Sequence, residues 1–214
     1  MPTTLCPIYA EHNDLPKEVW NEVRSNIHGI ESYMGKDFGE KKYPLLFSVR
    51  SGAAISMPGM MDTVLNIGIN DKTVEGLAVT TNNPRFSWDA YRRLLNMFGD
   101  VVRGISHKDF EDRFDAVKAE AGVKNDVGLN VDQLKKLCEE YKGVFKNHNQ
   151  KFPHDPFDQL TACIKAVFGS WNAPRAVNYR EINNIKDLIG TAANVQTMVF
   201  GNMGGEYGTG VAFS

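Results

Sequence analysis

Cysteine, long apolar runs and an excess of either charge are all scarce in this 214-residue sequence. The three cysteines, Cys6, Cys138 and Cys163, form no Cys-x-x-Cys pair, which argues against a zinc ribbon and a disulfide scaffold. We therefore expect reduced, mostly buried thiols in a reducing compartment. No apolar run approaches the ~20 residues that a membrane span needs, and residues 1–7 lack the basic and apolar regions of a signal peptide.

The charge balance excludes further classes of protein. Lys and Arg number 24 and Asp and Glu number 26, so the formal net charge is −2. A general nucleic-acid or membrane-surface binder needs a basic field, which this composition does not supply. Twelve Phe, seven Tyr and three Trp provide enough burial to exclude disorder of the whole chain. We expect a soluble, cytoplasmic globular protein, with organellar targeting left open because its signals can lie outside these residues.

Hydrophobic periodicity divides the chain into three parts. Residues 15–34 predict an amphipathic helix, and residues 44–49 and 64–70 predict strands. The next hundred residues predict a helical bundle. Its apolar stripes lie within 91–102, 110–117, 134–145 and 160–168, and Ser106 with Asp109, Asn130 with Gln133, and Asp155 with Pro156 are spaced as helix starts.

Strand signals return after Trp171. Residues 175–180 and 194–200 alternate, and a Gly-rich turn leads on to 211–213, as in a β-hairpin. The expected fold class is α+β, with sheet residues in 1–70 and 171–214 and a helical insertion at 71–170. Because Ser214 falls inside the last strand, and an unpaired half-strand leaves an open sheet edge, we expect a domain cut in its hairpin.

Two loops carry residues that suit a phosphorylated ligand. Arg50 follows a strand and precedes small residues, where a guanidinium holds phosphate bidentately or forms a structural ion pair. Asp62 and Thr63 lie beyond the same loop and orient phosphate or a metal-bound water, or else bond to local backbone. Residues 201–210 contain five glycines, which indicate either a phosphate-covering loop or a plain hairpin turn.

Other kinds of chemistry find less support. The five histidines have no helical metal-ligand spacing, and we expect no metal site within the chain. No Ser-His-Asp or Cys-His arrangement is supported by spacing. The residues by themselves therefore predict a nucleotide-phosphate site and nothing more specific.

Several runs resemble one enzyme family, the pyruvate, phosphate dikinases, in its N-terminal nucleotide-binding domain. The longest is FSVRSGAAISMPGMMDTVLNIGIN at 47–70, and it is long enough to be specific. Shorter matches follow in the same order along nearly the whole chain. They are NPRFSWDAYRR at 83–93, AVFGSWN at 166–172, NVQTMVFGNM at 194–203 and GTGVAF at 208–213.

The resemblance implies a partial ATP-grasp fold and a set of site residues. Arg50 would hold the ATP phosphates as the catalytic residue, and the loop containing Gly59, Asp62 and Thr63 would border the triphosphate. The remaining nucleotide-binding residues implied by the resemblance are Gln196, Met198 and Val199 at the adenine pocket and Gly204, Gly208, Thr209 and Gly210 in a loop over the phosphates. Positioning and charge neutralisation dominate phosphoryl transfer, so an Arg, backbone N–H groups and Mg²⁺ are the expected parts.

The resemblance also implies partners beyond these residues. Enzymes of the family convert ATP, phosphate and pyruvate to AMP, diphosphate and phosphoenolpyruvate through a phosphohistidine on another domain, and a barrel binds pyruvate. The Mg²⁺ ligands are expected outside this chain, as is a lysine for the nucleotide, and the full-length protein is expected to be a homodimer. The chain alone is therefore expected to bind ATP weakly or not at all and to be inactive.

Two other readings stay open from the sequence. A truncated, non-catalytic paralogue would act as a binding or regulatory module, and a native mass near 24 kDa, close to the 23.9 kDa of this chain, would favour it. A different dikinase of the same superfamily, such as one acting on glucans, would share the general layout but not the long run at 47–70.

Overall fold

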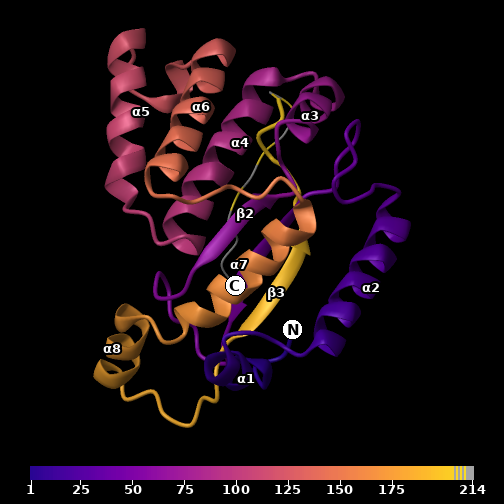
Figure 1. Ribbon diagram of the computed structural model, residues 1–214, viewed down its shortest axis with the longest axis vertical. Helices are drawn as coiled ribbons and strands as arrows, with labels where there is room; N and C mark the ends of the chain where they lie inside the picture. Colours follow the sequence, from indigo (N-terminus) through magenta and orange to yellow (C-terminus); the bar gives the residue numbers. More distant parts are fainter. Residues whose placement is uncertain (205, 207, 209, 211–214) are drawn as a thin grey trace.

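A computed structural model describes residues 1–204, 206, 208 and 210 (Figure 1). Its helices are α1 (Leu5–His12), α2 (Lys17–Met34), α3 (Thr73–Thr81), α4 (Pro84–Met97), the π-helical turn η1 (Phe98–Val102), α5 (His107–Ala121), the short 3₁₀ turn η2 (Asp126–Gly128), α6 (Val131–Asn147), α7 (Pro156–Ser170) and α8 (Pro174–Ile182). Its strands are β1 (Phe47–Gly52), β2 (Thr63–Ile67) and β3 (Ala192–Thr197). This mixture of helices and sheet is compatible with the predicted α+β class. The expected strand at 211–213, and the hairpin it would complete, lie outside the described residues.

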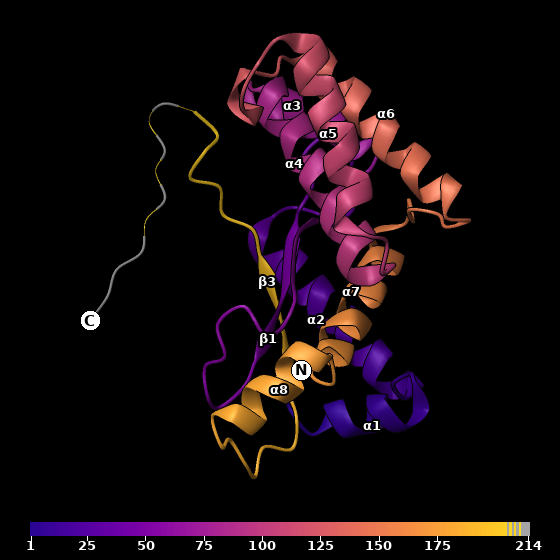
Figure 2. The same cartoon turned by 90° about the vertical axis from the view of Figure 1, so that its left-hand side faces the viewer.

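The three strands form one antiparallel sheet in the order β2-β1-β3. Val49 lies opposite Val64 on β2 and Val195 on β3, so apolar side chains share one face. α7 contacts all three strands and packs on this apolar face (Figure 2). Ser48 lies opposite Gln196 on the other face, which is therefore the polar face of the sheet.

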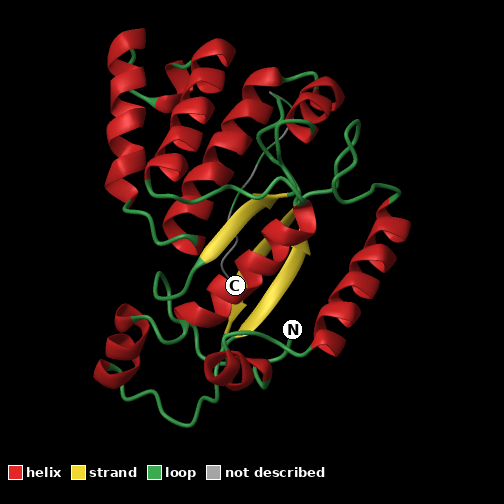
Figure 3. Ribbon diagram, in the orientation of Figure 1, coloured by secondary structure: helices red, strands yellow, loops and turns green. Residues whose placement is uncertain are grey.

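α3, α4, α5 and α6 gather at one end of the sheet, and α1 and α8 lie at the other end (Figures 1 and 3). α4 is central in this group, because it contacts α3, α6 and β2. The interior of the group is aromatic. Phe110 packs edge-on against Tyr141 at 5.1 Å between ring centroids, and Phe98 packs against Phe152 at 5.2 Å.

Most predicted elements are confirmed, with shifted ends. The helix expected over 15–34 is α2, and the strand expected over 44–49 is β1, displaced toward the C-terminus. The strand expected over 64–70 stops at Ile67, because the next residue, Gly68, has a φ angle of 109°, which an extended strand does not allow. β3 confirms the strand expected over 194–200, although it ends at Thr197. α1 and α3 were not predicted.

The expected strand over 175–180 is wrong, because this segment forms α8. Pro174 starts the helix at a position where its missing N–H costs nothing. Arg180 stacks on the Trp171 ring at 3.9 Å and donates to the Trp171 carbonyl at 2.8 Å. Ala176 is the buried residue of α8. Alternate residues of this segment therefore do not form the buried face that a half-buried strand would have.

The predicted helix starts have mixed outcomes. Asn130 and Gln133 form a complete capping box at α6, and the Asp155 carboxylate accepts from the first turn of α7, so both are confirmed. α5 begins directly after Ser106, as expected, but the Ser106 side chain makes no cap hydrogen bond. The Asp109 carboxylate is instead 2.7 Å from the His148 ring, so the expected cap pair is not formed.

A buried glutamine fastens α7 to the end of β2. Gln159 accepts from the Gly68 N–H at 2.8 Å and donates to the Ile69 carbonyl at 3.0 Å. Its amide also donates to the Pro153 carbonyl at 2.9 Å. These bonds satisfy backbone groups just beyond the end of β2, and they fix the position of α7 relative to the sheet.

Asp71 joins the same region to the helical group. Its carboxylate accepts from the Tyr91 hydroxyl of α4 at 2.9 Å and from the Lys142 ammonium of α6 at 2.5 Å. Burial by itself would raise the pKa of Asp71, but the hydrogen bonds from Lys142 and Tyr91 outweigh it and lower that pKa. The ionised carboxylate therefore ties two helices to the end of β2.

Candidate functional site

A cavity of about 590 Å³ lies between the C-terminal part of α2, the sheet and the segment that follows β3. Its size is within the range of small-molecule sites. The residues that line it are Ile30, Tyr33 and Met34 from α2, Ser48 and Arg50 from β1, and Gln196, Thr197, Met198 and Val199 from β3 and beyond. Four of the residues predicted for nucleotide binding thus lie around one cavity.

The strand register explains why Arg50 and Gln196 come together. Successive side chains of a strand point to opposite faces, so Ser48 and Arg50 lie on the face opposite Phe47 and Val49, where Ser48 is buried and Arg50 is exposed. Gln196 is the cross-strand partner of Ser48, and its carbonyl is 3.5 Å from the Ser48 hydroxyl. Arg50 and Gln196 are therefore diagonal neighbours on one face, and both side chains are exposed.

Arg50 is free to bind an anion. Within the described part of the chain, the arginine ion pairs involve Arg92, Arg93, Arg113 and Arg175, and not Arg50. The structural ion pair that was the alternative for Arg50 is therefore not formed with any described residue. An exposed guanidinium presents a planar set of donors that matches phosphate oxygens.

The residues that α2 contributes to the apolar wall of the cavity were not predicted for the site from the sequence, whereas Val199 was. Tyr33 is 89% exposed and Val199 is 87% exposed, and Met34 is also exposed. Tyr33 lies outside the apolar stripe of the helix predicted over 15–34, and a large aromatic residue on the solvent side of an amphipathic helix is the signal that could have found it. These side chains place apolar surface next to the polar groups of the sheet.

The loop between β1 and β2 places its predicted residues outside the lining of this cavity. Asp62 forms an ion pair with Arg175 of α8, and the Arg175 Nε also donates to the Met60 carbonyl at 3.1 Å. Thr63 is exposed and lies directly opposite Arg50 in the sheet, on the side away from β3. Gly59 has φ 72°, which favours glycine, and the space where a Cβ would lie is open.

The glycine-rich segment begins against α4. The Asn83 amide donates to the Met203 carbonyl at 2.7 Å, and Phe200 packs edge-on against Phe86 at 4.9 Å. Gly204, Gly208 and Gly210 are exposed and do not line the cavity around Arg50. Thr209 lies outside the described residues.

The described residues offer no arrangement that would support metal or thiol chemistry. In residues 1–204, 206, 208 and 210, no group of three or more His, Cys, Asp or Glu side chains is placed to hold a metal ion. Cys6, Cys138 and Cys163 are free and buried, as predicted. Burial raises the pKa of each thiol, which suppresses the reactive thiolate. Of the helices that the structure describes, none combines the length and apolarity needed to span a bilayer.

The fold and this cavity define an arrangement in which an arginine that forms no ion pair with any described residue lies beside apolar walls on the polar face of a sheet, and such an arrangement suits a phosphorylated small molecule. The family described as "Pyruvate phosphate dikinase, AMP/ATP-binding domain" matches residues 11–214. The chain belongs to this family.

Similar proteins agree on the family. The chain is 52% identical over 214 residues to "Pyruvate, phosphate dikinase, chloroplastic" of Mesembryanthemum crystallinum, covering 99% of this chain and 22% of that protein. It is 51% identical over 210 residues to pyruvate, phosphate dikinase of Giardia intestinalis, covering 98% and 24%. For the enzyme of Clostridium symbiosum, the identity is 50% over 208 residues, covering 96% and 24%. The chain thus spans less than a quarter of the length of these relatives.

Proposed function

We propose that ATP binds in the cavity between α2 and the polar face of the sheet, with its phosphates at Arg50 and its adenine toward Met198 and Val199. The observation that carries this proposal is that Arg50, Gln196, Met198 and Val199 line one cavity. Arg50 and Gln196 are 146 positions apart in the sequence (196 − 50). The family supports it, because its description names AMP and ATP as ligands.

The cavity divides chemically in the way that an adenine nucleotide does. Arg50 supplies positive charge and bidentate donors for phosphate oxygens. The Gln196 side-chain amide can donate to or accept from sugar or base. Tyr33, Met34 and Val199 offer apolar surface to the base. The roles proposed for these five residues rest on their positions around the cavity.

A second set of residues completes the proposed site at its margin. We propose that Thr63, beside Arg50 in the sheet, and the loop with Gly59 and Asp62 border the triphosphate. Gly204, Gly208, Thr209 and Gly210 would cover the phosphates with freed backbone N–H groups. This layout corresponds to a partial ATP-grasp fold in two parts, residues 1–70 and 171–214, with a helical insertion at 71–170.

The complete protein is proposed to be a dikinase. It would convert ATP, phosphate and pyruvate to AMP, diphosphate and phosphoenolpyruvate, with a phosphohistidine domain and a pyruvate-binding barrel as the partners of this domain, and it would be a homodimer. Mg²⁺ would accompany the ATP, with its ligands outside these residues. The cytoplasm stays the predicted compartment, although relatives from Mesembryanthemum, Arabidopsis and Oryza are named chloroplastic.

The test is ATP titration of the full-length protein that carries Arg50→Gln, with Arg113→Gln as the matched control, because the chain alone is expected to bind ATP weakly or not at all. Arg113 is exposed on α5 and its nearest carboxylate, on Glu140, is 4.0 Å away. A charged hydrogen bond to phosphate contributes about 1.5–3 kcal/mol, so we expect Arg50→Gln to weaken ATP binding by about tenfold or more. Arg113→Gln should bind as the unaltered protein does. Equal affinity of the two variants would contradict the proposed role of Arg50.

A further inference from the structure

Three polar residues form a row across the strands of the sheet. Arg50 of β1 lies opposite Thr63 on β2 and opposite Asn194 on β3. Residues directly opposite each other point to the same face of a sheet, with Cβ atoms about 4.5–5.5 Å apart. All three side chains are exposed, so the row places a hydroxyl, a guanidinium and an amide next to one another. Thr63 and Arg50 belong to the proposed ATP site, and Asn194 completes the row beside them.

The side-chain amide of Asn194 is available to a ligand. It forms no hydrogen bond with the residues that the structure describes. The amide nitrogen lies over Gly52, where an added Cβ would come within 2.5 Å of it. The absence of a side chain at Gly52 therefore leaves room for the amide on this face. An asparagine amide has two N–H donors and one acceptor, so it can bind an oxygen of an anion without carrying charge itself.

The spacing along β3 gives Asn194 a place relative to the nucleotide. Alternate residues of a strand share a face and are about 6.6–6.8 Å apart. Gln196 lines the cavity around Arg50, and Asn194 lies one such step further from Met198 and Val199. Asn194 is outside the cavity lining and level with Arg50 across the strands. With the adenine toward Val199, the sugar falls near Gln196, and the phosphate chain extends toward Arg50 and Asn194.

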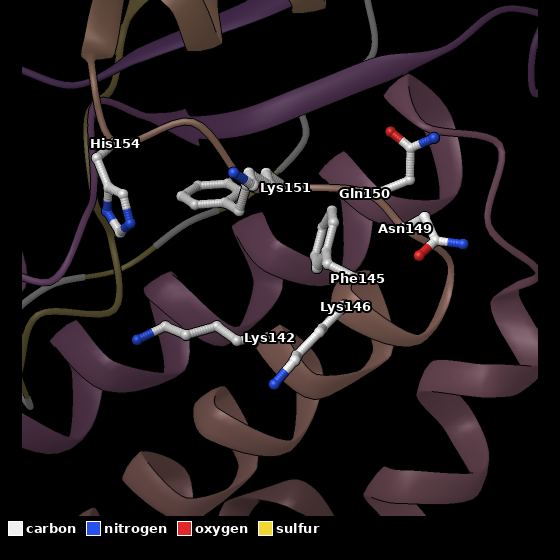
Figure 4. Close-up of a pocket in the computed structure, with 8 residues that line it drawn as sticks. Lys142, Phe145, Lys146, Asn149, Gln150, Lys151 and His154 are labelled. Carbon is white, nitrogen blue, oxygen red and sulfur yellow. The ribbon is translucent and has the colours of Figure 1, made fainter.

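A cavity of about 550 Å³ beside α6 is built differently (Figure 4). Lys142, Lys146 and Lys151 stand around it on long side chains. The rings beneath them offer little surface to a ligand, because Phe145 is 1% exposed and Phe152 is 8% exposed. On the sheet, by contrast, the strand register holds the three polar residues at a fixed spacing before a ligand binds, which lowers the entropy lost on binding.

We propose that Asn194 binds the phosphate chain of the nucleotide together with Arg50, a role that rests on the proposed binding of ATP. The Arg50 guanidinium supplies the charge, and the Asn194 amide donates to a phosphate oxygen from the neighbouring strand. The α-phosphate is nearest the sugar, so a donor beyond Gln196 contacts the β- and γ-phosphates. Asn194 therefore determines how strongly the site prefers ATP to AMP.

The affinities of the full-length protein for AMP, ADP and ATP test this role. Asn194→Ala removes the amide, and we expect it to weaken ATP binding by about fivefold to tenfold and AMP binding by less than about twofold. Asn194→Asp should weaken ATP binding further, because its carboxylate pairs with Arg50 and repels phosphate. Asn194→Gln keeps the amide and should bind ATP more tightly than Asn194→Ala does. Asn21→Ala and Asn21→Asp, at an exposed position of α2 outside the cavity lining, are the matched controls and should leave all three affinities unchanged.

Arg50→Gln in the same titrations separates the two proposals. If Arg50→Gln leaves the ATP affinity unchanged, the proposed ATP site itself is wrong. If Arg50→Gln weakens ATP binding while Asn194→Ala and Asn194→Asp bind ATP as tightly as the Asn21 variants do, the role of Asn194 alone is overturned. Equal losses of AMP and ATP affinity in Asn194→Ala would also overturn it, because a contact with the β- and γ-phosphates cannot weaken AMP binding.

Discussion

Gly76, in the middle of α3, is the position where one added methyl group should have the clearest cost. A Cβ there would lie 1.6 Å from the Lys41 carbonyl oxygen and 3.0 Å from the Lys42 Cα. Both contacts are with backbone, so no side-chain rotation can relieve them. α3 therefore packs directly on the 41–42 segment, and the Thr80 hydroxyl fastens it there by donating to the Lys42 carbonyl at 2.7 Å.

Three effects set the size of the change in Gly76→Ala. Replacing Gly by Ala within a helix contributes about 1 kcal/mol of stability. Overpacking costs about 1–3 kcal/mol, and moving the 41–42 segment also weakens the Thr80 bond, at about 0.5–1.5 kcal/mol. The cost outweighs the gain, and we expect a net destabilisation of about 2 kcal/mol, with Tm lower by about 4–8 °C for a domain of this size.

Gly143→Ala is the matched control for this experiment. Gly143 lies within α6 and has nothing within 4 Å of the position of an added Cβ, so it reports the helix preference alone. It should raise the free energy of unfolding by about 0.5–1 kcal/mol. Urea unfolding of both variants, followed by circular dichroism, gives the difference. The packing argument would be refuted if Gly76→Ala were as stable as Gly143→Ala.

Two further predictions concern helix starts and pH. Asn130→Ala should lower the free energy of unfolding by about 1 kcal/mol through loss of the capping box, whereas Ser106→Ala should be nearly neutral, since Ser106 makes no cap bond; equal losses in urea unfolding would count against this. Asp71→Asn should cost about 0.5–1 kcal/mol, because the carboxylate is partly exposed and solvent screens its pair with Lys142. Since folding lowers the pKa of Asp71, this cost should be complete above about pH 5 and shrink as the pH falls through the lowered pKa. If the cost of Asp71→Asn grew as the pH fell, the result would contradict this prediction.

Elements with strong local signals were predictable from the sequence, and those set by tertiary contacts were not. The caps at Asn130 and Asp155 and the stripes of α2 and α6 depend on nearby residues, and these predictions are confirmed. The segment that forms α8 was mistaken for a strand because residues 175–180 alternate. Pro174 was the local signal that favoured a helix start instead. α3 was missed because its place depends on the close approach of Gly76 to a distant segment.

The candidate site shows the same division. The resemblance singled out Arg50, Gln196, Met198 and Val199, and the antiparallel register of β1 and β3 brings them around one cavity. Tyr33 and Met34 could not be assigned to it, because no local pattern tells that the end of α2 lies beside β3. The pairing of Asp62 with Arg175 was equally hidden, since it joins a loop residue to a residue of α8 far away in the sequence.

The central claim is that ATP occupies the cavity around Arg50, and backbone amide NMR during an ATP titration tests it most directly. The account predicts saturable shifts concentrated at residues 30–34, 48–50 and 196–199, the segments that line the cavity. Saturable shifts gathered elsewhere, with these segments unmoved, would contradict it.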